Sequence, residues 1–416
     1  MPNHSSNTAR PLSPSLKERG AGGESFDTIR PYNDDEVRDA IDSLLHDRQF
    51  SHILKGMVPF LPLAVSRGIL RLATMGIHST LGFQVRFMKP IVKYILWRCA
   101  TGCSFDHPDI APGPERYTFI SNHRDIVLDS AILDAKLHDD HFPTTCEIAI
   151  GDNLLIYPWI RTLVRLNKAF IVQRSLPMRE MLKASQTMSR YMHYAINDKH
   201  ENIWIAQREG RAKDSSDQTQ VSLLKMLAIT GEGSTAGAIE SLKALNIVPL
   251  SISYEYDPCD YLKAQEFQQK RDNAAWKKSK QDDLTNMRTG IFGQKGHVHY
   301  QTGRPVNTWI DQLADLPEKE FFQSLAQRLD CEIHRSYRLY PGNYIAADLQ
   351  NGKAQFANRY TPADQATFEE YLDQRMAMAS QGLQAAGATP DPTFLRECII
   401  TMYANPVKNK MEKLRD

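Results

Sequence analysis

Between residues 115 and 253, short apolar runs alternate with longer segments that have helical periodicity. The apolar runs have the length of strands and fall at 117–121, 146–150, 169–173, 203–206 and 247–253. The intervening segments place apolar residues on one helical face and fall at 126–138, 155–166, 178–197 and 221–245. Short apolar strands joined by helices form parallel sheets covered on both faces. The pattern therefore predicts an α/β fold with a mainly parallel central sheet flanked by helices, and a later strand at 296–301.

The chain before residue 100 has a different pattern. Asn33 and Glu36 have the spacing of a capping box and precede an apolar helical face. Residues 51–100 contain no Asp or Glu, and their basic residues stand among apolar ones: Lys55, Arg67, Arg71, Arg86, Lys89, Lys93 and Arg98. The uncharged run 72–85 is too short and too polar to span a bilayer. We expect an N-terminal pair of basic amphipathic helices, which either lies on anionic headgroups or packs on the next domain with its basic edge in water.

These patterns divide the chain into four parts. Residues 1–29 are rich in Ser, Pro and Gly and are expected to be a disordered lead-in. The basic amphipathic helical region occupies 30–100, and the α/β domain occupies 101–310. Residues 311–416 have a helical period and are expected to form a C-terminal helical extension, whose role the sequence does not indicate.

Composition and charge narrow the class of protein. The 416 residues are 42% hydrophobic and 24% charged, as in ordinary globular proteins. A net charge of +1 argues against a surface built to bind nucleic acid. Six cysteines are too few for a disulfide scaffold and predict reduced thiols, and the first residues lack the apolar core of a secretory signal. We therefore expect a cytoplasmic protein.

The strongest candidate for chemistry follows directly after the first predicted strand. His123 stands at its carboxyl end, where α/β sheets place their sites, and histidine is the usual general base near neutral pH. Asp125 or Asp129 would orient it. Positions six apart on a continuous helix face away from each other, so His123 and Asp129 meet only if His123 lies in the turn and Asp129 in the first helical turn. In the alternative, Asn122 or Asp125 caps the helix and His123 is merely exposed.

Two other predicted strands also end in charged residues. Arg174 follows the strand at 169–173, and the segment 207–214 (QREGRAKD) follows the strand at 203–206. In a parallel sheet these ends share one rim with His123. Arginine binds phosphate in a bidentate manner and lysine acts as a point charge, so the rim suits a phosphorylated substrate. The alternative is ordinary solvated charge in loops.

Together these segments resemble the glycerolipid acyltransferases, the family of enzymes that form lysophosphatidic and phosphatidic acid. That family has an Asn-His block with a downstream Asp, a Gly-x-x-Phe-x-x-Arg strand, a Phe-Pro-Glu-Gly-Thr-Arg block and an apolar strand around Pro. The corresponding segments occur here in the same order, at Asn122–Asp129, Lys168–Arg174, Arg208–Lys213 and Ile247–Leu250. The resemblance covers about residues 50–310.

The chain departs from the family pattern in its first three blocks. Five residues instead of four separate His123 from Asp129, so either the turn bulges or Asp125 takes the partner role. Asp129 is favoured because the apolar residues before it resemble those of the family. In the second block Lys168 stands where Gly is usual and Ile171 where Phe is usual, while Arg174 matches. Gln207-Arg208 replace Phe-Pro, and Arg211 comes one residue early because the Thr is absent. These differences concern the substrate more than the reaction.

The resemblance implies roles for particular residues. His123, oriented by Asp129, would take a proton from an acceptor hydroxyl as it attacks an acyl thioester. The acceptor's anion would be held by residues of the second and third blocks: Arg174, Glu209, Gly210, Arg211 and Lys213. The donor would be acyl-CoA or acyl-carrier protein, and the acceptor a lysophospholipid or glycerol phosphate in phospholipid synthesis. The protein would be peripheral on the inner membrane face, in contact with anionic lipids.

Other functions remain possible from the sequence alone. The chain could be a catalytically inactive lipid-binding scaffold of the same fold, or a hydrolase that uses His123 to activate water. The segment His138–His141 contains possible metal ligands, but contiguous residues at a helix end rarely converge on one ion. Cys99, Cys103 and His107 have a loose zinc-like spacing without a second pair of ligands. We therefore predict no metal and no bound cofactor.

Overall fold

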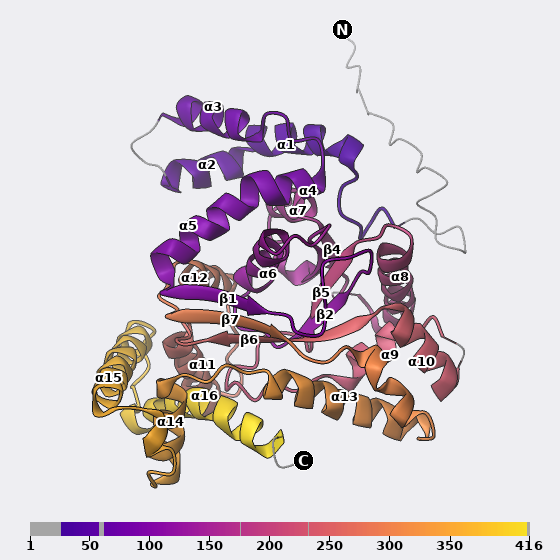
Figure 1. The fold of residues 1–416 in the computed structure, drawn as a ribbon. Helices are drawn as coiled ribbons and strands as arrows, with labels where there is room; N and C mark the ends of the chain where they lie inside the picture. Colours follow the sequence, from indigo (N-terminus) through magenta and orange to yellow (C-terminus); the bar gives the residue numbers. More distant parts are fainter. Residues whose placement is uncertain (1–25, 58–61, 175, 232, 414–416) are drawn as a thin grey trace.

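The protein is an α/β structure built on one seven-stranded sheet (Figure 1). The computed structural model describes residues 26–57, 62–174, 176–231 and 233–413. Of the lead-in expected at 1–29, residues 1–25 lie outside the described residues. The strands are β1 Gly102–Asp106, β2 Thr118–Ser121, β3 Cys146–Gly151, β4 Ala169–Val172, β5 Asn202–Ala206, β6 Ile247–Tyr254 and β7 His297–Thr302. This confirms the predicted fold class.

The sheet order is β1-β7-β6-β2-β5-β3-β4. Strands β6, β2, β5, β3 and β4 run parallel to one another, whereas β7 is antiparallel to β6 and β1 is parallel to β7. The parallel part contains the strands predicted between 115 and 253. Because parallel strands end at one edge, the carboxyl ends of β2, β4 and β5 share a rim, as the sequence pattern predicted.

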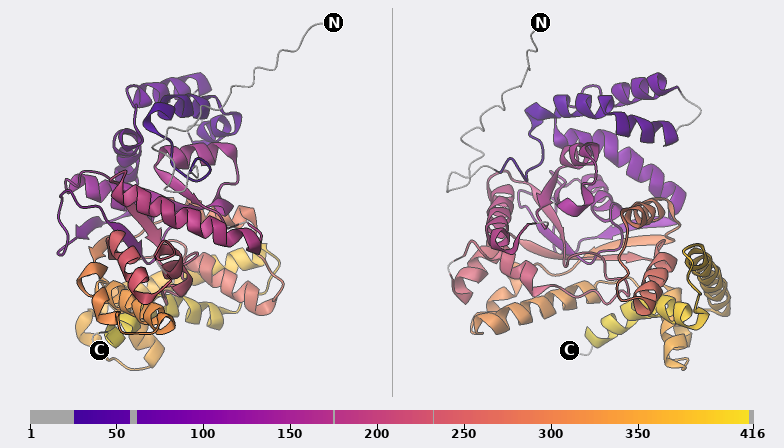
Figure 2. Two further views of the ribbon diagram at one scale, coloured as in Figure 1. Left: turned by 90° about the vertical axis from the view of Figure 1, so that its right-hand side faces the viewer. Right: turned by 180° about the vertical axis from the view of Figure 1, so that it is seen from behind.

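Strand residues alternate between two apolar cores, one on each face of the sheet. Phe119 and Trp204 face the core that contains α5 (Lys89–Cys99) and α6 (Leu128–Asp139). Ile120 and Ile205 face the core that contains α8 (Met178–Asn197), α9 (Val221–Leu227), α10 (Thr235–Ala244) and α13 (Glu318–Arg335). Successive side chains on a strand point to opposite faces, so helices must cover both. Figure 2 shows the sheet between these helical layers.

The helices of the central part lie between the strands in sequence. They are α6 Leu128–Asp139, α7 Pro158–Leu166, α8 Met178–Asn197, α9 Val221–Leu227, α10 Thr235–Ala244, α11 Asp260–Asp272 and α12 Lys280–Phe292. The single helix expected at 221–245 is thus two helices. The segment between α9 and α10 contains Gly231 and Gly233, which favour a break.

The N-terminal region contains more helices than the expected pair. Its elements are η2 Asp34–Glu36, α1 Val37–His46, α2 Arg48–Met57, α3 Leu63–Thr74, α4 Thr80–Gly82, the π-helix η3 Phe83–Met88 and α5 Lys89–Cys99. Residues 26–29, expected to belong to the disordered lead-in, are part of the packed structure. Phe26 and Ile29 are buried against the sheet domain, and Ile29 accepts a hydrogen bond from the backbone of Ile171 on edge strand β4.

The second half of the acid-free block is built into the α/β domain. Gln84 in η3 is buried and donates hydrogen bonds to Asp134 of α6 and to the carbonyl oxygens of Cys146 and Asn167. Helix α5 packs its buried residues on the same core as α6. Only two residues separate the end of α5 from β1. The domain boundary expected at 100 therefore lies inside one packed unit.

The C-terminal helices divide between two cores. They are α13 Glu318–Arg335, α14 Pro341–Asn351, α15 Pro362–Ala385 and α16 Pro392–Lys413, preceded by the short helices η5 Val306–Thr308 and η6 Ile310–Leu313. Helix α13 buries Phe321 and Leu325 in the core of the sheet, whereas α14, α15 and α16 form a cluster of their own around α11. The extension is therefore helical, as predicted, but α13 completes the α/β domain. No helix in the described part of the chain is both long and apolar enough to cross a bilayer.

Candidate active site

His123 and Asp129 meet at the carboxyl end of β2. The strand ends at Ser121 and α6 begins at Leu128, so His123 lies in the turn and Asp129 in the first helical turn. His123 Nδ1 is 2.8 Å from Asp129 Oδ2. The imidazole side chain is 14% exposed and the carboxylate 1% exposed. This arrangement fixes Nδ1 against an acceptor and leaves Nε2 to exchange a proton with a substrate.

The remaining partners of Asp129 are also hydrogen-bond donors. The backbone N–H of Arg124 donates to Oδ2 at 2.6 Å, and the hydroxyl of Tyr254 donates to Oδ1 at 3.2 Å. Burial raises the pKa of Tyr254 well above its usual range, which keeps that hydroxyl protonated. These donors and His123 together hold the Asp129 carboxylate in one orientation.

Neighbouring strands hold the turn that carries His123. The side-chain amide of Asn122 donates to the carbonyl oxygen of Ile252 on β6 and accepts a hydrogen bond from the same residue's N–H. Trp204 on β5 places its ring edge-on to the imidazole, with 5.7 Å between the centroids. Its indole N–H donates to Ser121. Asn122 therefore joins β2 to β6 and does not cap α6.

Asp125, the alternative partner of His123, has a structural role. Its Oδ1 accepts hydrogen bonds from the backbone N–H groups of Val127 and Leu128, which begin α6. Burial, reinforced by the charge of Asp129, raises the pKa of Asp125. The structure thus brings Asp129 to His123, whereas Asp125 accepts the hydrogen bonds of two backbone N–H groups at the start of α6.

Arg174 and Glu209 lie together at the rim of the sheet. Arg174 follows β4, and its Nη1 is 3.5 Å from Glu209 Oε1, in a partly exposed pair. Its backbone N–H donates to Asp152. An exposed ion pair at this distance contributes little stability, so the guanidinium is available to an anionic ligand. Gly210 follows with a φ of +69°, a conformation that favours glycine.

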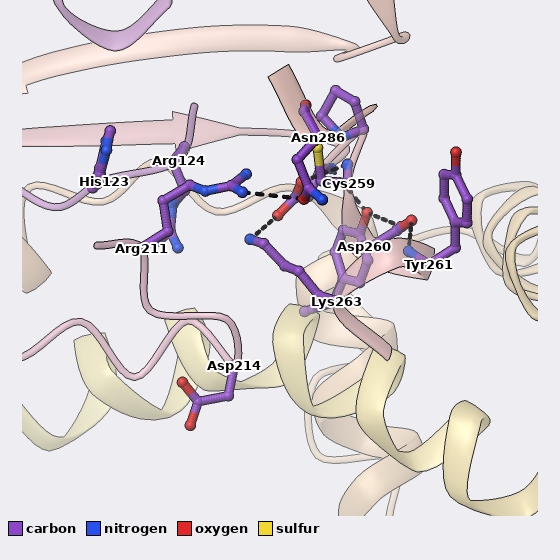
Figure 3. Close-up of polar contacts among 12 residues, drawn as sticks. His123, Arg124, Arg211, Asp214, Cys259, Asp260, Tyr261, Lys263 and Asn286 are labelled. Atoms are coloured by element: carbon purple, nitrogen blue, oxygen red, sulfur yellow. Dashed lines mark hydrogen bonds and ion pairs between the residues drawn. The ribbon is translucent and has the colours of Figure 1, made fainter. Parts of the chain in front are cut away.

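Arg211 is turned away from His123. Figure 3 shows its side chain extending toward Asn286 of α12, whose Oδ1 accepts a hydrogen bond from Nη2 at 3.2 Å. Its charge also interacts with Asp257 and Asp125. Nη1 is buried, with no hydrogen-bond partner among the described residues. Arg211 therefore has its backbone near the His123 turn, while its guanidinium is directed toward Asn286 and Cys259.

Lys213 forms an ion pair with Glu266 of α11. Burial lowers the pKa of Lys213, and Glu266 acts in the opposite direction. The cations expected in one cluster thus have separate partners. Arg174 pairs with Glu209 at the rim, whereas Lys213 contacts α11 and Arg211 contacts α12. Helices α11 and α12 follow β6 in sequence, so the block 207–214 alone gave no sign of these partners.

The possible metal ligands at the end of α6 have other contacts. Asp139 forms ion pairs with Lys89 and Lys93 of α5, and His138 lies 2.7 Å from Lys89 Nζ. The two lysine ammonium groups thus occupy the Asp139 carboxylate, which a metal ion would need as a ligand. Among the described residues, no three His, Cys, Asp or Glu side chains are grouped as metal ligands.

Sequence reasoning missed three residues around the histidine: Tyr254, Tyr300 and Trp204. The hydroxyl of Tyr300 on β7 donates to the carbonyl oxygen of Asp129. Tyr254 ends the apolar run of β6, and Trp204 stands inside β5, so each reads as an ordinary strand residue. Only the pairing of β2 with β5 and β6 brings Trp204 and Tyr254 to the His123 turn.

Residues 106–253, which contain β2 to β5, the His123 turn and β6 except its last residue, match the family model described as Acyltransferase. Among solved structures, the chain is similar to the 1-acyl-sn-glycerophosphate (LPA) acyltransferase PlsC from Thermotoga maritima, with 10% identity and a TM-score of 0.35. That likeness covers 70% of this chain and 95% of the other, and it is too weak to support an argument about substrate. No curated protein matches the chain.

Proposed function

The chain contains a domain of the acyltransferase family at residues 106–253, and from this premise we propose that it is an O-acyltransferase. It moves a fatty acyl group from a thioester to a hydroxyl of a lysophospholipid or glycerol phosphate, in phospholipid synthesis. The observation that carries the proposal is the 2.8 Å contact between His123 and Asp129 inside the matched domain. The donor is acyl-CoA or acyl-carrier protein.

The contact supports general-base catalysis. His123 Nε2 takes the proton of the acceptor hydroxyl while the hydroxyl oxygen attacks the thioester carbonyl. The buried Asp129 stabilises the imidazolium that forms. The tetrahedral intermediate then breaks its C–S bond, and the imidazolium returns the proton to the departing thiolate. A single transfer of this kind requires no covalent acyl-enzyme.

Arg174 supports an anionic acceptor, because its guanidinium lies at the rim in a partly exposed, long contact with Glu209. Arg211 supports the same assignment with its positive charge, which acts on Asp125 in the His123 turn. Arginine binds phosphate oxygens in a bidentate manner. We assign Arg174 and Arg211 to the phosphate of the acceptor, with Glu209, Gly210 and Lys213 shaping the loop between them.

A lipid acceptor lies in a membrane, so the proposed reaction needs a protein surface that can bind a bilayer. The N-terminal helices have such a surface. Helix α3 exposes Val65, Ile69 and Leu72, and helix α5 exposes Tyr94 and Trp97. Figure 1 places these helices at the end of the molecule opposite α14 and α16. Tyr and Trp favour the headgroup level of a bilayer, and basic residues favour anionic lipids. We propose that this face holds the protein peripherally on the inner face of the membrane.

A two-substrate assay tests the reaction. Purified protein receives radiolabelled acyl-CoA or acyl-carrier protein, with or without lysophosphatidic acid or glycerol 3-phosphate. Label in a lipid product that depends on the acceptor supports the proposal. Release of labelled fatty acid without an acceptor indicates a hydrolase instead, and no consumption of either thioester indicates an inactive lipid-binding scaffold.

Replacing the exposed aromatic residues of α5 is expected to weaken membrane binding. The variant Tyr94→Ser/Trp97→Ser removes the two side chains, which are 59% and 74% exposed. Each buried large side chain contributes about 1.5–3 kcal/mol, so affinity for anionic vesicles should fall at least about tenfold. Co-sedimentation measures this, with Met378→Ser on α15 as control. Equal binding by both variants would contradict the assignment.

A further inference from the structure

The segment after Arg211, which we call the 212–219 loop and which contains Lys213, has an unfavourable backbone conformation. Ser215 and Asp217 have φ values of 59° and 39°, in the left-handed region that non-glycine residues rarely adopt. Such conformations persist only where surrounding contacts impose them. The loop therefore needs partners outside itself, and these come from the C-terminal helices.

Helix α16 holds the first half of the loop through two asparagines. The side-chain amide of Asn405 donates to the carbonyl oxygen of Asp214 at 2.7 Å. Asn409 donates to the carbonyl oxygens of Ser215 and Ser216 at 3.2 and 3.3 Å. These bonds fix backbone groups that belong to no helix or strand.

Helix α13 holds the second half. Asp330 accepts hydrogen bonds from both the N–H and the hydroxyl of Thr219, at 2.8 and 2.6 Å. His334 Nε2 donates to the carbonyl oxygen of Asp217 at 2.8 Å, and the hydroxyl of Tyr337, two residues after the end of α13, donates to the Asp217 carboxylate at 2.7 Å. The two helices are joined, because Arg335 of α13 donates to the carbonyl oxygen of Lys413 of α16 at 2.8 Å.

Asp217 connects this loop to the His123 turn. Its Oδ2 is 2.6 Å from Nη2 of Arg124, and both side chains are buried. Arg124 is the residue whose N–H donates to Asp129. The C-terminal helices therefore contact the loop that follows Arg211. Through Asp217 and Arg124 they also connect to the turn that carries His123.

We propose that α13 and α16 act as a clamp that sets the affinity for the anionic acceptor by holding the 212–219 loop. Asn405 and Asn409 are positioning residues, since they contact backbone carbonyls of the loop and not the candidate site. The clamp lies outside the residues that match the acyltransferase family. The predicted effect on the KM for the acceptor rests on the proposed function. The predicted effect on the 212–219 loop does not depend on it.

The variant Asn405→Ala/Asn409→Ala tests the clamp, because it removes three hydrogen bonds and leaves the apolar packing of α16 in place. We expect the KM for the acceptor to rise about tenfold, with the KM for the acyl donor and kcat unchanged within about twofold. Amide hydrogen exchange in residues 212–219 should also become faster, whether or not substrate is present.

A matched control separates the clamp from general destabilisation. Thr361→Ala removes the hydroxyl that caps α15, in the same extension but away from the loop. It should lower thermal stability without changing the acceptor KM or exchange in the loop. Unchanged exchange in the asparagine variant, or an equal change in Thr361→Ala, overturns the clamp. Absence of acyl transfer in the unaltered protein overturns the proposed function. In that case, amide hydrogen exchange in residues 212–219 still tests whether α16 holds the loop.

Discussion

His123→Ala is expected to lower kcat for acyl transfer by about 10²–10⁴-fold, the usual contribution of a positioned general base. The side chain lies in a turn and is partly exposed, so its removal should change the fold little. Proton removal from the acceptor would then depend on water, while the contacts that bind the acceptor remain. The KM values should therefore change much less than kcat. Steady-state assays with each substrate varied in turn measure both quantities.

His141→Asn is the matched control for this variant. His141 is an exposed histidine with a φ of 64°, which asparagine tolerates. Its replacement should leave kcat unchanged. If His123→Ala retained full activity with a circular dichroism spectrum equal to that of the unaltered protein, the imidazole would not be the base and the mechanism would fail.

Asp129→Asn should lower kcat by a similar factor, on the order of 10²–10⁴, and also destabilise the fold. The carboxylate accepts hydrogen bonds from His123, Arg124 and Tyr254, which are all donors. An asparagine amide would turn its NH₂ group toward at least one of them, and it could hold the wrong tautomer of the imidazole. Leaving a buried donor unpaired costs about 1–3 kcal/mol, which urea unfolding would detect.

Asp125→Asn provides the comparison for Asp129→Asn. Asparagine keeps an oxygen that accepts the hydrogen bonds of Val127 and Leu128, and it is as good a helix cap as aspartate. We expect kcat to stay within about threefold of the unaltered value. Loss of activity in Asp125→Asn, together with full activity in Asp129→Asn, would exchange the roles of the two carboxylates.

The sequence predicted much of the sheet because buried parallel strands have a distinctive pattern. The six strands predicted from apolar runs all occur in the structure. Strand β1 was missed, since its sequence Gly-Cys-Ser-Phe-Asp has neither an apolar run nor a clear alternation. It lies at an edge of the sheet and is only half-buried, so it needs fewer apolar residues.

The candidate site was less predictable because it depends on contacts between distant segments. The order of the strands was enough to place His123, Asp129 and Arg174 at one rim. The orientations of Arg211 and Lys213 depend on Asn286 and Glu266, which lie on helices encoded after β6. Those partners are polar residues in charged segments, and no periodic pattern marks them.

The connection between α5 and β1 determines how freely the sheet can move relative to the N-terminal helices. The N–H of Ala100 donates to Leu96 within α5, and the N–H of Thr101 donates to Gly296 next to β7. Both linking residues are thus hydrogen-bonded, and this junction has no hinge. With Tyr94 and Trp97 resting on a lipid surface, the whole sheet would take one fixed tilt, and His123 would stay at a constant height above the bilayer.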